Sequence, residues 1–128
     1  MTTLTKTVAV GWFEIPVSNV ARAKQFYETV FEVKLSPQNY GPVAMEKFPW
    51  EQGASGGGAP GTLVKADGYT PSHAGTLVYF PVEDIDAALG RIKQSGGKEL
   101  MPKTSMGGYG FIATFEDTEG NRVALLSR

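Results

Sequence analysis

The chain has 128 residues, of which 41% are hydrophobic, and its 12 basic and 13 acidic residues leave a formal net charge of −1. This size and composition predict one folded domain, and the balanced charge excludes a general attraction to nucleic acid or an anionic membrane. Cysteine is absent, which excludes disulfides, zinc-thiolate sites and a cysteine nucleophile. No apolar run approaches the roughly 20 residues that cross a bilayer. The polar first residues lack the apolar core of a signal peptide, so we expect a cytoplasmic protein.

The first half of the chain predicts a strand, a helix and three further strands. β-Branched and aromatic residues indicate a strand over residues 8–17. Ser18 or Asn19 can cap the following helix, since a short side-chain acceptor meets the free amides of a first turn. Apolar residues at helical spacing then extend this helix to about Phe31. The further strands are predicted over residues 32–38, 43–48 and 62–66.

Glycines concentrate in residues 52–61, between two of these strands. Such a segment can form a phosphate-binding loop, or it can be a turn where backbones approach closely. No Gly-Lys-Ser or Gly-Lys-Thr follows, which excludes a P-loop. We favour the turn, because that is the usual role of glycine.

The second half repeats the order of the first after a polar connection over residues 67–74. A strand over residues 76–82 leads to Asp84, a good helix cap. The next helix shows the clearest amphipathic pattern of the chain, and Gly96 is suited to end it. Three strands are then expected over residues 98–101, where Pro102 should break the strand, 111–115 and 121–126.

The two halves match at several positions when they are aligned at one fixed offset. Placing Val17 on Val82 also places Asn19 on Asp84, so both strand-to-helix junctions match. We therefore expect an α+β fold of two βαβββ modules, at about residues 8–66 and 75–127, forming one curved, mixed eight-stranded sheet. The helices should cover its convex side. A ligand pocket is expected on the concave side, lined by residues that point away from the helices.

Several segments resemble a known family. Residues 13–19 (FEIPVSN) and 23–27 (AKQFY) resemble the opening of a vicinal oxygen chelate module, and residues 82–88 (VEDIDAA) and 117–121 (DTEGN) match its second half. That superfamily includes glyoxalase I, the bleomycin-resistance proteins and extradiol dioxygenases. Residues 101–111 (MPKTSMGGYGF) are similar to a bacterial glyoxalase-like branch. The resemblance implies a single glyoxalase-like domain over residues 1–128.

The resemblance also makes a claim about metal. Metal-dependent relatives hold a divalent ion with inward His and Glu ligands, and three of these positions fall on Trp12, Leu77 and Ala124. The remaining ligand belongs near residues 58–61, where neither His nor Glu occurs. None of these side chains can coordinate a divalent cation. We therefore expect no bound metal and no cofactor, and neither classical glyoxalase I nor dioxygenase activity.

Glu14 is the candidate catalytic residue. Alternation along the first strand places it on the concave side beside Trp12, with Tyr79 at the equivalent place in the second half. A carboxylate against aromatic walls loses solvation, which would raise its pKa toward that of a general acid or base. The alternative is a solvated carboxylate, or one paired with Arg122. His73 is the only histidine, and we favour a loop position for it over a role as general base.

Apolar side chains predicted to share the concave side form the candidate binding wall, although core packing is the commoner use of any one of them. The expected substrate-binding residues are Trp12, Leu77, Tyr79, Met101, Tyr109, Phe111, Arg122 and Ala124.

Two functions fit this pattern. One is a metal-independent isomerase or lyase that uses Glu14 on a small organic substrate. The other is a non-catalytic protein that binds or sequesters a small, largely apolar molecule, as in the resistance branch. The resemblance further implies a homodimer, since relatives commonly complete their pockets at a two-fold interface.

Overall fold

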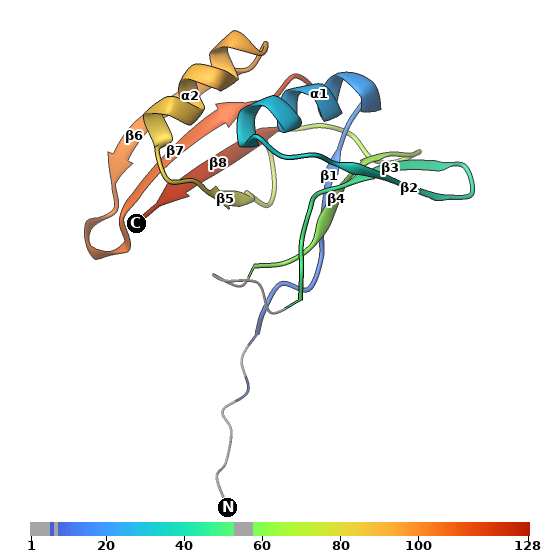
Figure 1. Ribbon diagram of the computed structural model, residues 1–128, viewed down its shortest axis with the longest axis horizontal. Helices are drawn as coiled ribbons and strands as arrows, with labels where there is room; N and C mark the ends of the chain where they lie inside the picture. Colours follow the sequence, from blue (N-terminus) through green and yellow to red (C-terminus); the bar gives the residue numbers. More distant parts are fainter. Residues whose placement is uncertain (1–5, 7, 53–57) are drawn as a thin grey trace, which may run out of the picture.

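The computed structural model describes residues 6, 8–52 and 58–128 of the chain. They form two modules, each with the order βαβββ (Figure 1), which confirms the predicted repeat. The first contains β1 (Phe13–Pro16), α1 (Val20–Phe31), β2 (Ser36–Tyr40), β3 (Val43–Lys47) and β4 (Gly61–Lys65). The second contains β5 (Tyr79–Pro81), α2 (Ile85–Gln94), β6 (Lys98–Ser105), the short 3₁₀ turn η1 (Gly107–Tyr109), β7 (Phe111–Glu116) and β8 (Arg122–Ser127).

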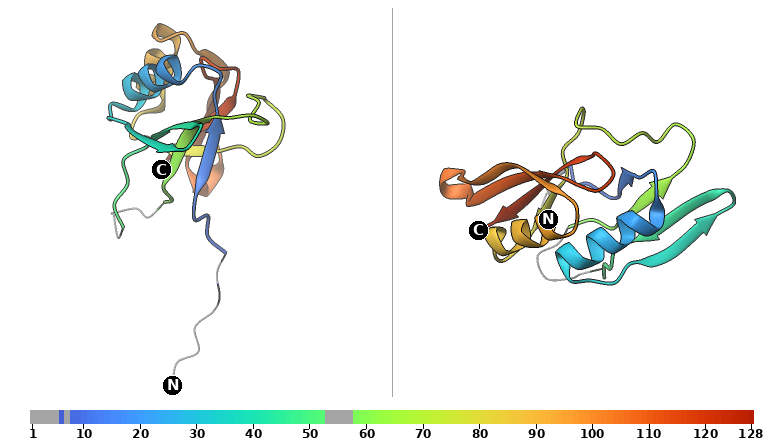
Figure 2. Two further views of the ribbon diagram at one scale, coloured as in Figure 1. Left: turned by 90° about the vertical axis from the view of Figure 1, so that its right-hand side faces the viewer. Right: turned by 90° about the horizontal axis from the view of Figure 1, so that it is seen from above.

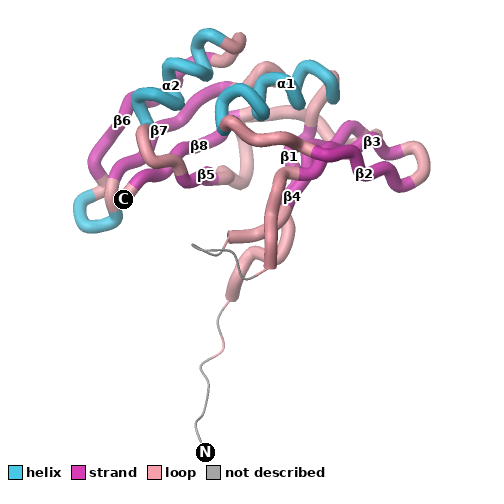
Figure 3. Tube along the Cα trace, in the orientation of Figure 1, coloured by secondary structure: helices cyan, strands magenta, loops and turns pink. Residues whose placement is uncertain are grey.

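The eight strands form two four-stranded sheets, where the sequence predicted one sheet of eight. Their orders are β1-β4-β3-β2 and β5-β8-β7-β6, and in each sheet only the first pair is parallel. The edge strands β1 and β5 are not paired with each other. The modules meet instead through α1 and α2, which contact each other (Figure 3).

One core serves both modules. Ile15 of β1 and Val17, which follows this strand, are 3% and 1% exposed. They belong to a single apolar cluster with the inner faces of both helices and of β7 and β8. Because half of this chain is too small to bury its own sheet face, the two modules stabilise each other.

The helix ends follow the local sequence as predicted. Asn19 and Asp84 are the N-caps, and each accepts a hydrogen bond of 3.0 Å from an amide of the first turn. Gly96 follows the end of α2 with a φ of +96°, a left-handed conformation that favours glycine.

Four strand boundaries differ from the prediction by three residues or more, and one of them is the start of β5, which lies three residues late, at Tyr79. β1 begins only at Phe13, which pairs with Gly61, the first residue of its parallel partner β4. β2 starts four residues late, because Glu32 ends α1 in a left-handed conformation, with φ +56°. β6 continues through Pro102, where a break was predicted. β6 is an edge strand, and one of its two register shifts spans this residue, between Met101 and Thr104. Edges and bulges tolerate a missing N–H. Residues 53–57 of the glycine-rich segment lie outside the described residues, so its interpretation is untested.

A polar cluster joins the turn before β8 to the first module. Asp117, 2% exposed, accepts hydrogen bonds from the Tyr27 hydroxyl at 2.7 Å, the Glu119 amide at 2.8 Å, and both the amide and the side chain of Asn121 at 2.9 and 3.0 Å. Asn121 also donates to the Pro16 carbonyl at 2.8 Å. Burial first, and then the charge of Asp117, raise the pKa of Tyr27 well above its usual value. The phenol therefore stays protonated as the donor.

Glu119 belongs to the same polar cluster between the modules, and its side chain is fully buried. It accepts hydrogen bonds from Arg22 at 2.7 and 3.0 Å and from the amides of Ser18 and Asn19 at 3.0 and 2.9 Å. Burial acts to raise the pKa of this carboxyl, but the hydrogen bonds from Arg22, Asn19, Thr118 and Ser18 outweigh it and lower the pKa below 4.5. The ionised form therefore stabilises the fold.

Glu119→Gln tests how much the ionised Glu119 contributes to the stability of the fold. Because the folded-state pKa of Glu119 is lowered, its stabilisation is present above the unfolded-state pKa and is lost as pH falls through the folded-state pKa. The variant should lose about 2 kcal/mol of unfolding free energy at pH 7, and this difference from the wild type should shrink as pH falls below 4.5. Urea unfolding at several pH values measures both quantities. The exposed Glu51→Gln is the control, and a difference that stays constant with pH would contradict the assignment.

Candidate binding site

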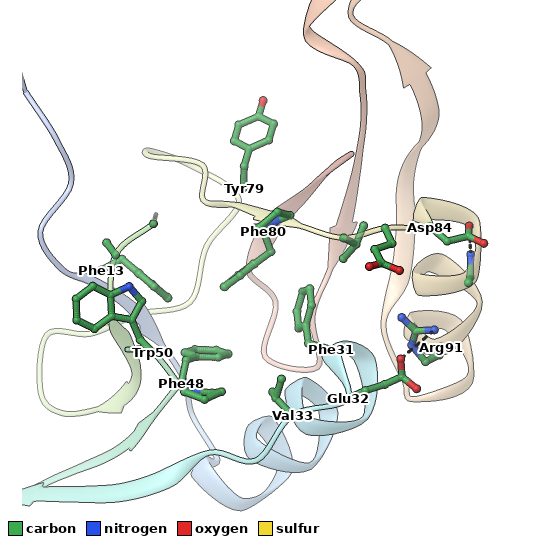
Figure 4. Close-up of a pocket in the computed structure, with 17 residues that line it drawn as sticks. Phe13, Phe31, Glu32, Val33, Phe48, Trp50, Tyr79, Phe80, Asp84 and Arg91 are labelled. Atoms are coloured by element: carbon green, nitrogen blue, oxygen red, sulfur yellow. Dashed lines mark hydrogen bonds and ion pairs between the residues drawn. The ribbon is translucent and has the colours of Figure 1, made fainter. Parts of the chain in front are cut away.

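A cavity of about 550 Å³ opens between the two modules, on the helix side of the sheets (Figure 4). Its floor is made of four phenylalanines, each at or near the end of a different element. They are Phe13 in β1, Phe31 at the end of α1, Phe48 after β3 and Phe80 in β5. The module junction therefore brings together rings that are far apart in the sequence.

Phe80 is the central ring of this floor. Its centroid lies 4.8 Å from Phe31, 5.5 Å from Phe48 and 5.6 Å from Phe13. The Phe13 and Phe80 rings meet edge to face, at 78°, an arrangement that aromatic quadrupoles favour. Since these rings pack on the shared core without filling the junction, they leave an aromatic wall facing the cavity.

The mouth of the cavity carries its charged and amphipathic groups. Trp50 and Tyr79 are 37% and 43% exposed there. Arg91 donates from Nε to the Val30 carbonyl at 2.8 Å, and its Nη1 lies 3.9 Å from Glu32 Oε1. It thus satisfies a carbonyl in the last turn of α1. Asp84 caps α2. The interior is thus apolar and the polar groups stay at the rim, a lining that suits a small apolar ligand.

Of the predicted binding residues, only Tyr79 lines this cavity. Trp12, Tyr109 and Phe111 are exposed, and Ala124 is fully buried. Leu77 and Met101 are half-buried and lie outside the cavity lining. The roles of all these residues remain predictions.

The sequence reasoning missed the four phenylalanines because it expected the ligand pocket only on the concave side, among residues that point away from the helices. The signal that could have found them is that all four lie at or near the end of an element.

Glu14 and Arg122 line a different, smaller cavity. Glu14 is exposed and accepts a hydrogen bond of 2.9 Å from the Tyr69 hydroxyl. That hydrogen bond, with the charge of Glu14, raises the pKa of Tyr69. Because Glu14 is exposed, its carboxylate keeps contact with solvent, and its catalytic role remains a prediction. His73 lies in the segment between β4 and β5, with Nε2 2.8 Å from Glu116.

The donor set does not fit the metal of the family. Trp12, Leu77 and Ala124 stand at the expected ligand positions, and their side chains are not ligands for a divalent ion. Within residues 6, 8–52 and 58–128, no group of three or more His, Asp or Glu side chains is placed to hold a metal. The absence of bound metal and cofactor remains a prediction.

Comparison with known proteins establishes the family. Residues 9–125 match the model of the Glyoxalase/Bleomycin resistance protein/Dioxygenase superfamily, and the chain belongs to this superfamily. A "Glyoxylase-like domain-containing protein" from Didymella fabae is 28% identical over an alignment of 125 residues, and the match covers 93% of this chain and 93% of that protein.

Solved structures show the same fold. A glyoxylase/bleomycin resistance protein/dioxygenase domain from a Frankia species superposes with a TM-score of 0.71 at 15% identity, covering 95% of this chain and 98% of that one. A glyoxalase/bleomycin resistance protein from a Streptomyces species gives 0.68 at 23% identity, covering 92% and 99%.

Neither helix in the described part of the chain has the length and apolar character needed to cross a membrane. The cytoplasmic location remains a prediction.

Proposed function

We propose that this protein is a metal-independent member of its superfamily that binds a small, largely apolar, planar molecule in the cavity between its modules. The observation that carries this proposal is the aromatic wall around Phe80. The cavity volume, about 550 Å³, falls within the range of small-molecule sites. Sequestration without turnover, as in resistance-type proteins, is the simplest function of such a site.

Ala87→Trp tests the site without disturbing the core. Ala87 is exposed on the first turn of α2 and lines the cavity, so an indole there would occupy the ligand volume. Phenylnaphthylamine, a neutral fluorophore that brightens in apolar surroundings, is a suitable probe. The wild type should bind it saturably, and the variant should bind it about tenfold more weakly or not at all.

Ala21→Trp is the matched control, because Ala21 is an exposed alanine on the first turn of α1 and does not line the cavity. It should bind the probe like the wild type. Equal binding by all three proteins, or no binding by the wild type, would contradict the proposal.

The enzymatic alternative assigns acid–base chemistry to Glu14 in an isomerase or lyase reaction. Its structural support is the hydrogen bond from Tyr69, which pairs a carboxylate with a proton donor. Since Glu14 does not line the inter-module cavity, this chemistry would need a substrate on the other side of β1. Turnover that survives in Glu14→Gln would end this alternative.

We further propose that the chain forms a homodimer. Residues 8–12 leave the body of the domain (Figure 1), and Val8, Val10 and Trp12 are 105%, 69% and 42% exposed. Together with exposed Met106 and Tyr109, they offer apolar surface toward the roughly 800 Å² that each partner buries in a standard interface. Light scattering at micromolar concentration should give twice the chain mass, and Val8→Glu with Val10→Glu should shift it toward the monomer. A monomeric wild type would contradict this proposal.

A further inference from the structure

A second cavity, of about 110 Å³, lies between β1, β8 and the segment that connects β4 to β5. This connecting segment loops out on the side of the sheets away from the helices (Figure 2). The small cavity and the aromatic cavity share no lining residue, so the two can be occupied independently.

Hydrogen bonds to β1 and β8 hold the walls of this cavity in place. The Ser72 amide donates to Asn121 Oδ1 at 3.1 Å, and the Arg122 amide donates back to the Ser72 carbonyl at 3.2 Å. Tyr69 fixes Glu14 from the same segment. A site whose walls are already ordered loses little conformational freedom when a ligand binds.

Two side chains of opposite charge line this cavity without forming an ion pair. Glu14 and Arg122 both line it, yet within the described residues neither forms an ion pair, with the other or with any third group, within 4.0 Å. One Glu14 oxygen accepts from Tyr69, and the other has no protein donor among the same residues. The hydroxyl-bearing residues Thr70, Ser72 and Thr76 complete the polar wall.

We infer that this cavity is a binding site for a small zwitterion of the amino-acid class, with its ammonium group on Glu14 and its carboxylate on Arg122. A guanidinium presents paired donors that match a carboxylate, and a carboxylate accepts from an ammonium. Water occupies about 30 Å³ per molecule, so the cavity has room for roughly four waters or for a ligand the size of alanine. A ligand with a single charge would leave one of the two side chains without a partner.

Amide NMR spectra of the full chain, titrated separately with L-alanine, propionate and ethylamine, test this inference. Alanine should shift the amide signals of Ser72, Asn121 and Arg122 saturably. It should bind about tenfold more tightly than either singly charged analogue, because only the zwitterion makes both charge-assisted contacts. Phenylnaphthylamine bound in the aromatic cavity should leave the alanine affinity unchanged.

Glu14→Gln and Arg122→Gln should each weaken alanine binding about tenfold. Glu51→Gln and Arg128→Gln remove exposed charges outside the cavity and are the matched controls. Three results would overturn the inference. The first is the absence of any shift at millimolar alanine, and the second is binding of propionate or ethylamine as tight as that of alanine. The third is an alanine affinity in either cavity variant equal to that of the wild type.

Discussion

Asp117→Ala should lower the unfolding free energy by about 4 kcal/mol, because buried groups that lose a hydrogen-bond partner cost about 1–3 kcal/mol each. The carboxylate accepts four hydrogen bonds, from Tyr27, from the Glu119 amide and from two nitrogens of Asn121. The variant leaves all four donors without it. For a chain of this length, the melting temperature should fall by about 15 °C. Urea denaturation and calorimetry measure both changes.

Two comparisons separate the loss of the Asp117 hydrogen bonds from a general effect of removing a carboxylate. Asp67→Ala removes an exposed aspartate from a turn and should change stability by less than about 0.5 kcal/mol. Tyr27→Phe should cost about 1–2 kcal/mol. Its effect should largely disappear in the Asp117→Ala background, because the two residues share one contact. Additive losses would show that the Tyr27–Asp117 hydrogen bond does not couple the modules.

The local sequence predicted the repeat because each junction carries its own signal. A β-rich run, an Asn or Asp cap and an amphipathic stripe occur in the same order in both halves, and Asn19 and Asp84 cap helices as expected. The arrangement of the modules has no such local signal. Whether β1 pairs with β5, or α1 packs on α2, depends on packing between residues far apart in sequence. One sheet of eight and two sheets of four therefore share the same pattern of strands.

The candidate site was hard to predict for the same reason. Alternation along a strand indicates which side of the sheet Phe80 faces, but it could not show that the junction leaves a cavity beside this ring. Glu14 and Arg122 were expected on one side of the sheets, and both line one small cavity. What the sequence could not show was the course of the connecting segment, whose Ser72 closes that cavity through non-local hydrogen bonds.

Phe80→Ala should lower the unfolding free energy by about 3 kcal/mol and weaken phenylnaphthylamine binding about tenfold. The ring packs against Phe31, Phe48 and Phe13, and also lies 6.3 Å from Tyr27. Its removal therefore takes contacts from both modules and leaves a hole at their junction. The same ring forms the centre of the cavity floor, so one substitution should act on stability and on binding together.

Phe80→Leu separates these two effects. Leucine retains most of the apolar volume, so the loss of stability should stay below about 1.5 kcal/mol, while the flat face that the probe stacks on is still lost. Phe111→Ala is the matched control, because this ring is 40% exposed and lies under Lys103 outside the cavity. It should bind the probe like the wild type and lose less stability than Phe80→Ala. If Phe80→Leu bound the probe as tightly as the wild type, the aromatic wall would have no special role, and general apolar character would account for the cavity.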